Sequence, residues 1–237
     1  MERVNKILVI PDVHGRDFWE AAVNAFKDDV DKIVFTGDYH DPYEDEGITR
    51  EKSIENFEKI LTFFEANKDK TVMLIGNHDL HYLFSIRMGT SRFDRENYQR
   101  LYEMFNEYEN DFRIAYEAEI GNKKYLFSHA GFMKEWYDIY AEDIGEPTVE
   151  NLNKLIKTSE GVNALCAVSH YRGSFDNTGS IIWSDVRERF NKDDSQVEGW
   201  YQVFGHTQLR QPIVLEDWAC IDCRRAFIID SEGFKEV

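Results

Sequence analysis

Short polar motifs built from aspartate, asparagine and histidine recur along the chain, each beside a glycine or a small turn. There are five: Asp12-Val13-His14, Gly37-Asp38-Tyr39-His40-Asp41, Gly76-Asn77-His78-Asp79, Ser128-His129-Ala130-Gly131 and Gly205-His206. Imidazole, carboxylate and amide groups without thiolate suit Mn, Fe, Zn or Co rather than a soft metal. Asp12 and His14 are two positions apart, so in an extended segment their side chains share a side and can bind one ion. A carboxylate such as Asp38 can bridge two ions that clamp the oxygens of a phosphoryl displacement.

The elements predicted around the first three motifs place them at the ends of strands. Apolar runs at residues 6–10, 32–35 and 71–75 are typical of buried strands, and one motif follows each run. Apolar residues at helical spacing predict helices over residues 17–26 and 49–67. The alternation of strand and helix predicts right-handed crossovers and a parallel sheet, whose carboxyl ends are the usual place for a ligand.

The rest of the chain carries weaker signals. The strands predicted here cover residues 112–120, 123–127, 200–204, 213–215, 218–221 and 226–229, the first two as a hairpin around Gly121-Asn122. Helices are expected within residues 91–109 and over residues 136–158, where Pro147 interrupts the helical pattern. We therefore expect one α/β domain over residues 1–237, parallel early and antiparallel late, with residues 82–110 and 135–160 as helical cap insertions.

Composition limits the partners and the compartment. The 237 residues carry a formal net charge of −17, which disfavours long nucleic acid and anionic membranes as partners. A phosphate site then needs local positive charge, which metal ions can supply. The three cysteines cannot all pair within one chain, and Cys220 and Cys223 lack the second pair of a four-thiolate zinc site. With no signal-peptide pattern and no membrane-length apolar run, we expect a cytoplasmic protein.

Taken in order, the five motifs resemble the calcineurin-like binuclear metallophosphoesterase superfamily, whose pattern is DxH, GDxxD, GNH(D/E), a histidine and GH. The resemblance spans residues 7–208. It implies a four-layer αββα sandwich of two mixed β-sheets with helices outside. It also implies two divalent metal ions, with Mn or Fe favoured over Zn, Co and Ni.

The resemblance also implies a role for each matching position. Asp12 and His14 would bind the first ion, Asp38 would bridge both, and Asn77, His129 and His206 would bind the second. His78 matches the catalytic histidine that protonates the leaving oxygen, and Asp41 matches its orienting partner. A carboxylate on the other ring nitrogen fixes the tautomer and raises the basicity of a histidine. A hydroxide between the two ions would be the nucleophile.

The last motif helps to place the chain within the superfamily. Gln208 stands where many phosphodiesterase members have a second histidine, and the single histidine resembles the phosphoprotein phosphatase and diadenosine tetraphosphatase branch. That branch has arginines where this chain has Pro42 and Ile75. Arg172 resembles the branch's phosphate-binding arginine, a residue type whose fork binds phosphate oxygens in pairs. His40, within the second motif, is the other predicted substrate-binding residue.

Three functions follow from these residues. A phosphomonoesterase acting on a phosphoprotein or a small phosphorylated metabolite is the first prediction. A nucleotide pyrophosphohydrolase or phosphodiesterase is the alternative. Pro42 and Ile75 favour it, because a site with fewer arginines suits a less charged phosphate. A non-catalytic metal-dependent binding module is the third, and the complete set of ligands together with His78 and Asp41 argues against it.

Overall fold

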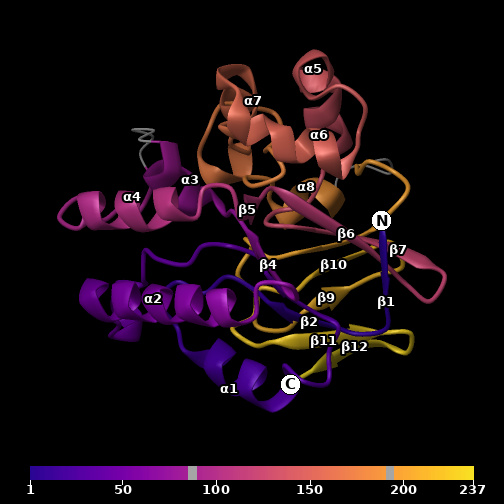
Figure 1. Cartoon of the computed structure of the whole chain (residues 1–237). Coiled ribbons are helices and arrows are strands. Elements are labelled where there is room, and N and C mark those ends of the chain that lie inside the picture. Colours follow the sequence, from indigo (N-terminus) through magenta and orange to yellow (C-terminus); the bar gives the residue numbers. More distant parts are fainter. Residues whose placement is uncertain (85–89, 191–194) are drawn as a thin grey trace. The chain divides into compact units, whose positions relative to one another are not determined.

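The computed structural model describes residues 1–84, 90–190 and 195–237 (Figure 1). These residues fall into two compact units. Unit 1 comprises residues 1–5 and 113–223, and unit 2 comprises residues 6–112 and 224–237. The chain forms two six-stranded sheets, each mixing parallel and antiparallel pairs, with helices around them. The predicted fold class, α/β with two mixed sheets, is confirmed.

The sheet of unit 2 has the strand order β12-β11-β2-β3-β4-β5. Its central strands and the helices between them follow the predicted order: β2 (Ile7–Ile10), α1 (Phe18–Phe26), β3 (Lys32–Phe35), α2 (Arg50–Ala66) and β4 (Thr71–Leu74). The outer strands are β5 (Phe112–Arg113), β11 (Phe227–Asp230) and β12 (Gly233–Glu236). β2, β3 and β4 are parallel with β3 between the other two, so the turn after β3 is flanked by the turns that carry the first and third motifs.

Helix α2 shows how apolar spacing builds this unit. Thr49 caps the helix by accepting a hydrogen bond from the Lys52 backbone N–H at 3.2 Å. Phe57 on its apolar face is fully buried and stacks on Tyr39, with 5.0 Å between ring centroids. Phe105 of helix α4 (Tyr98–Glu107) lies 4.7 Å from Phe57, and helix α3 (Asn77–Phe84) precedes α4 in the chain.

The sheet of unit 1 has the strand order β1-β6-β7-β8-β10-β9. Its strands are β1 (Glu2–Val4), β6 (Ala115–Ile120), β7 (Lys123–Ser128), β8 (Tyr201–Phe204), β9 (Ile213–Val214) and β10 (Trp218–Cys220). β6 and β7 form the predicted hairpin. The expectation that the late strands are antiparallel is wrong for β8, which runs parallel to both β7 and β10. The long helical crossover between β7 and β8 allows this, because parallel neighbours need a long connection rather than a turn.

The helices of unit 1 lie between β7 and β8 in the chain. They are α5 (Lys134–Ile144), α6 (Val149–Lys154), α7 (Ser159–Leu165) and α8 (Val186–Phe190), with short 3₁₀ turns at η2 (Leu155–Lys157) and η3 (His170–Arg172). Pro147 separates α5 from α6 as expected. The predicted cap segments contain α4 and α5–α6, although residues 85–89 of the first lie outside the described residues. The single-domain organisation with two caps stays a prediction.

Two further findings concern membrane-spanning helices and the thiols. In the part of the chain that the structure describes, no helix combines the length and the apolar content that crossing a bilayer requires. Cys166, Cys220 and Cys223 are present as thiols rather than in a disulfide, and the last two are buried.

The aromatic stack of unit 2 predicts a large cost for truncating Phe57. Phe57→Ala is expected to lower the free energy of unfolding by about 3–5 kcal/mol, because it leaves a cavity between Tyr39 and Phe105. Phe175→Ala removes the same atoms from a fully exposed side chain and is expected to change stability little. Denaturant unfolding of both variants checks this, and equal stabilities would contradict the packing described here.

Candidate active site

The motif residues of unit 2 lie at one edge of its sheet. Asp12 and His14 follow β2, Asp38 follows β3, and Asn77 and His78 begin α3 after β4. All five side chains are buried, with exposed fractions between 1% and 6%. Because the three strands are parallel and adjacent, their carboxyl ends bring these turns together.

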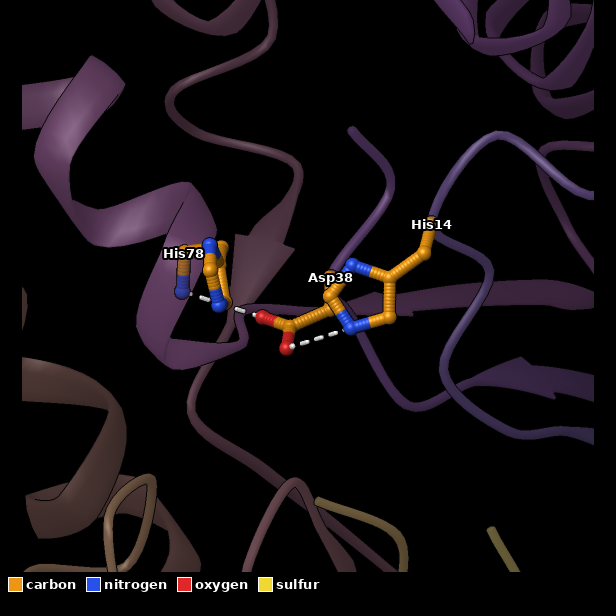
Figure 2. A group of neighbouring side chains, drawn as sticks. All are labelled: His14, Asp38 and His78. Atoms are coloured by element: carbon orange, nitrogen blue, oxygen red, sulfur yellow. Dashed lines mark hydrogen bonds and ion pairs between the residues drawn. The ribbon is translucent and has the colours of Figure 1, made fainter. Parts of the chain in front are cut away.

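Three of these residues form a compact group of ligating atoms. His14, Asp38 and His78 each offer one atom, and these atoms lie within 4.8 Å of one another (Figure 2). The His14 Nε2 is 3.3 Å from Asp38 Oδ2, and the backbone N–H of His78 donates to Asp38 Oδ1 at 3.0 Å. Figure 2 shows the Asp38 carboxylate between the two imidazole rings.

The hydrogen bonding of His14 tests whether this group suits a metal ion. Its Nδ1 lies 3.0 Å from the carbonyl oxygen of His40, which can only accept, so Nδ1 carries the proton. Nε2 is then the nitrogen on the side of the Asp38 carboxylate, where a neutral ring offers a lone pair. An imidazole held by a carbonyl through its other nitrogen is the usual form of a histidine ligand, and the carboxylate beside it is a second ligand for the same ion. The residues therefore fit a divalent ion.

Asp12 and Asn77 are the two predicted ligands of unit 2 that this group does not include. In the described part of unit 2, the group of ligating atoms consists of His14, Asp38 and His78, and Asp12 is not in it. The hydroxyl of Thr36 donates to Asp12 Oδ1 at 3.3 Å. Asn77 is the first residue of α3. The assignment of both as metal ligands stays a prediction.

The backbone around the group is strained. His14, Asp38 and Asp41 have left-handed φ angles of 46°, 54° and 58°. For residues other than glycine such conformations cost of order 1–3 kcal/mol each and tend to gather at functional sites. A Cβ on Gly76 would overlap the Asp38 carboxylate, so this position requires glycine for Asp38 to keep its place.

The Asp79 carboxylate ties the turns after β3 and β4 together. It accepts backbone hydrogen bonds from Gly76 at 2.8 Å, from Asp38 at 2.7 Å and from Tyr39 at 3.0 Å. Burial and the neighbouring Asp38 raise the pKa of Asp79, while these backbone donors oppose that rise. Asp79 is therefore a structural acceptor that fixes the backbone of Asp38.

The predicted catalytic pair is in direct contact. His78 Nδ1 lies 2.6 Å from Asp41 Oδ2, and both residues are buried. Burial alone would lower the pKa of His78, but the carboxylates of Asp38 and Asp41 outweigh it and raise that pKa, with the charge of Arg92 acting in the opposite direction. The pair therefore favours a protonated His78 with Nδ1 held by Asp41.

The sequence prediction missed the next member of this network, Tyr82. Its hydroxyl donates to Asp41 Oδ1 at 2.5 Å and accepts from the backbone N–H of Asp94 at 2.8 Å. Tyr82 lies one helical turn after His78 on α3, so the i, i+4 spacing is the signal that could have identified it.

His40 belongs to the same side of the site. Its ring is buried, and Nε2 lies 3.2 Å from Asp94 Oδ2. Asp94 also accepts from Arg50 at 3.1 Å and from the backbone N–H of Asn97 at 3.1 Å. The contact with Asp94 therefore holds the His40 ring in place. The predicted contact of His40 with substrate stays a prediction.

Two predicted metal ligands, His129 and His206, lie in unit 1. They follow the parallel strands β7 and β8, and the Gly205 N–H donates to the His129 carbonyl at 2.8 Å. His129 Nε2 and His206 Nδ1 are 3.1 Å apart. His206 has a left-handed φ of 64°. Two buried imidazole nitrogens at this separation suit a shared proton or a shared ion.

Arg172 supports the turn that carries His206. Its Nη2 donates to the His206 carbonyl at 3.1 Å and to the Thr207 hydroxyl at 2.9 Å, and its Nε lies 2.8 Å from Asp185 Oδ2. Burial raises the pKa of Asp185, but hydrogen bonds from Arg187 and the charge of Arg172 bring it below its ordinary value. Arg172 therefore positions His206, and its predicted role in binding phosphate stays a prediction.

The comparisons with known proteins identify the family. Residues 5–210 match the sequence model of the calcineurin-like phosphoesterases. The chain belongs to this family. Family membership makes it a metal-dependent phosphoester hydrolase, in agreement with the buried histidine and aspartate group of unit 2 that could hold a metal ion. No curated protein is similar enough in sequence to count as a match.

Solved structures resemble the fold at low sequence identity. A protein serine/threonine phosphatase from Saccharomyces cerevisiae, described as similar to human phosphatase PP5, is 15% identical with a TM-score of 0.53, over 96% of this chain and 73% of that chain. An archaeal phosphodiesterase is 14% identical with a TM-score of 0.37, over 98% of both chains. The hypothetical protein PH1004 from Pyrococcus horikoshii OT3 is 14% identical with a TM-score of 0.35, over 53% of this chain and 55% of that chain. The yeast likeness supports the fold and leaves the substrate class open.

Removing His14 is expected to weaken metal binding. His14→Ala should raise the Kd for Mn²⁺ roughly tenfold or more, because an ion at Asp38 loses an imidazole ligand. His170→Ala removes an exposed imidazole and should leave the Kd unchanged. Isothermal titration calorimetry on metal-stripped protein checks this, and equal Kd values for His14→Ala and the parent would contradict the assignment.

Asp94→Asn is expected to lower stability in a pH-dependent way. Burial raises the pKa of Asp94, but hydrogen bonds from His40 and Asn97 and the charge of Arg50 lower it well below its usual range. A depressed pKa stabilises the fold above the ordinary aspartate pKa of about 3.9, and this contribution is lost as the pH falls further. Urea unfolding should show a deficit of about 1–3 kcal/mol at pH 7 that shrinks below pH 4. Asp28→Asn, at an exposed site, is the control.

Proposed function

We propose that this chain hydrolyses phosphoesters with two divalent ions and prefers monoesters, either a small phosphorylated metabolite or a phosphoprotein. One observation carries the proposal: the buried His78–Asp41 pair, 2.6 Å apart, adjoins the ligating atoms of His14 and Asp38. A proton donor beside a metal-ligand group is what phosphoester hydrolysis needs, since a leaving oxygen must be protonated while phosphate charge is neutralised.

Different residues of the site would bind the ions and donate the proton. His14 and Asp38, with Asp12, would hold one ion, and the sequence resemblance remains the ground for assigning Asn77, His129 and His206 to a second. When bound, such ions neutralise phosphate charge and activate water for attack on phosphorus. Asp41 holds Nδ1 of His78, which leaves Nε2 as the nitrogen that donates a proton to the leaving oxygen. Tyr82 fixes Asp41 in the orientation that this requires.

The alternative is a nucleotide pyrophosphohydrolase or phosphodiesterase. It would use the same ligands and the same pair, and Pro42 and Ile75 favour it by leaving two positions without positive charge. Initial rates with Mn²⁺ on p-nitrophenyl phosphate, bis-p-nitrophenyl phosphate and diadenosine tetraphosphate separate the two. A strong preference for the diester or the anhydride would contradict the monoester assignment. Metal binding without turnover on any of the three would indicate a non-catalytic module.

His78→Asn is expected to lower kcat by roughly 10²–10⁴-fold, because the leaving oxygen loses its proton donor. The loss should be larger for phenyl phosphate than for p-nitrophenyl phosphate, since a poorer leaving group depends more on protonation. Asp41→Asn should show a smaller loss with the same dependence on leaving group. His170→Asn, at an exposed histidine, is the matched control. An equal loss on both esters in His78→Asn would show that His78 does not act as the acid.

A further inference from the structure

Arg92 brings a guanidinium group to the His78–Asp41 pair. Its Nε donates to the Asp41 carbonyl at 3.0 Å, and its Nη2 lies 3.4 Å from His78 Nε2. Its Cζ lies 3.8 Å from the centroid of the Tyr43 ring. Arg92 thus contacts the nitrogen that the proposed mechanism uses as proton donor.

The backbone of Arg92 is strained in the same way as the site residues. Six non-glycine residues in the described part of the chain have a left-handed φ: His14, Asp38, Asp41, Arg92, His206 and Arg224. Four of the six are predicted metal or catalytic residues. Aspartate and asparagine tolerate this conformation through local hydrogen bonds, but arginine lacks that compensation. The contacts with Asp41, His78 and Tyr43 must therefore hold Arg92 in place.

The contacts described for the Arg92 side chain do not neutralise its positive charge. The contacts that the structure describes for its side chain are a carbonyl, an imidazole, the Ser91 hydroxyl and the face of Tyr43. None of these groups carries a negative charge, and an aromatic face attracts a cation without using its N–H donors. The guanidinium therefore keeps both its charge and its capacity to bind an anion.

Arg92 and His78 place two nitrogen atoms side by side. The Arg92 Nη2 and the His78 Nε2 are 3.4 Å apart. Two neighbouring oxygens of one phosphoryl group can contact both nitrogens at this separation. Arginine is suited to this contact, since its planar fork matches phosphate oxygens.

We propose that Arg92 binds a non-bridging oxygen of the substrate phosphoryl group, beside the oxygen that His78 protonates, and thereby selects phosphate monoesters. The assignment builds on the proposed function and names the substrate class for that site. A monoester carries more negative charge on its phosphoryl oxygens than a diester, so a fixed cation favours it. A diester also replaces one of these oxygens with an esterified one, which accepts a hydrogen bond from Arg92 less well.

The first test measures binding rather than turnover. Inorganic phosphate is titrated into the Mn²⁺-loaded parent protein, Arg92→Ala, Arg92→Lys and Arg95→Ala. Arg92→Ala should raise the phosphate Kd roughly tenfold or more, the size expected for losing a hydrogen bond to a charged group. The phosphate Kd of Arg92→Lys should lie between those of the parent and Arg92→Ala, because lysine keeps the positive charge but lacks the planar guanidinium fork. Arg95 is exposed and three positions along the chain, so Arg95→Ala should match the parent.

The second test compares two esters. In Arg92→Ala, kcat/KM for p-nitrophenyl phosphate should fall roughly tenfold or more, and that for bis-p-nitrophenyl phosphate should fall less. A residue that merely supports the Asp41 backbone would slow both esters equally. An unchanged phosphate Kd, or equal losses on the two esters, would overturn the assignment. Weaker phosphate binding in Arg92→Ala, with no ester cleaved by the parent, would support Arg92 and contradict the proposed function.

Discussion

The site in unit 2 is organised around one buried carboxylate, that of Asp38. It accepts a hydrogen bond from the His78 backbone at 3.0 Å and lies 3.3 Å from the Nε2 of His14. An ion at this point would be bound by Asp38 and His14 together. Two neighbouring residues keep Asp38 in place. Gly76 leaves room for its carboxylate, and the Asp79 side chain accepts a hydrogen bond from the Asp38 backbone N–H.

A second set of contacts holds the side chain of His78, whose backbone binds this carboxylate. The His78 ring is held by Asp41, Asp41 by Tyr82, and Tyr82 by the backbone of Asp94. The segment that contains Asp94 also carries Arg92. The loop before α4 therefore orients the His78 ring through Tyr82 and Asp41 and adds a cation beside it. In the proposed function, this cation supplies the local positive charge that a phosphate needs at a chain whose net charge is −17.

The sequence predicted the parts of the fold and site that depend on local pattern. The limits of β3 and the parallel order of β2, β3 and β4 followed from apolar runs and helical spacing, and the motifs marked the ends of those strands. The parallel pairing of β8 could not be predicted in this way, because partner choice depends on residues far apart in the chain. Tyr82 and Arg92 were missed because they lie outside the motifs, and their contacts with Asp41 join residues 41 and 51 positions apart in the sequence.

The central claim is that His14 and Asp38 hold a divalent ion beside His78. The most direct test is a crystal structure of the Mn²⁺-loaded protein with anomalous diffraction data. Our account predicts an anomalous peak at about 2 Å from the His14 Nε2 and an Asp38 carboxylate oxygen, with the His78–Asp41 contact intact. Full occupancy of Mn²⁺ elsewhere, with no peak between His14 and Asp38, would contradict it.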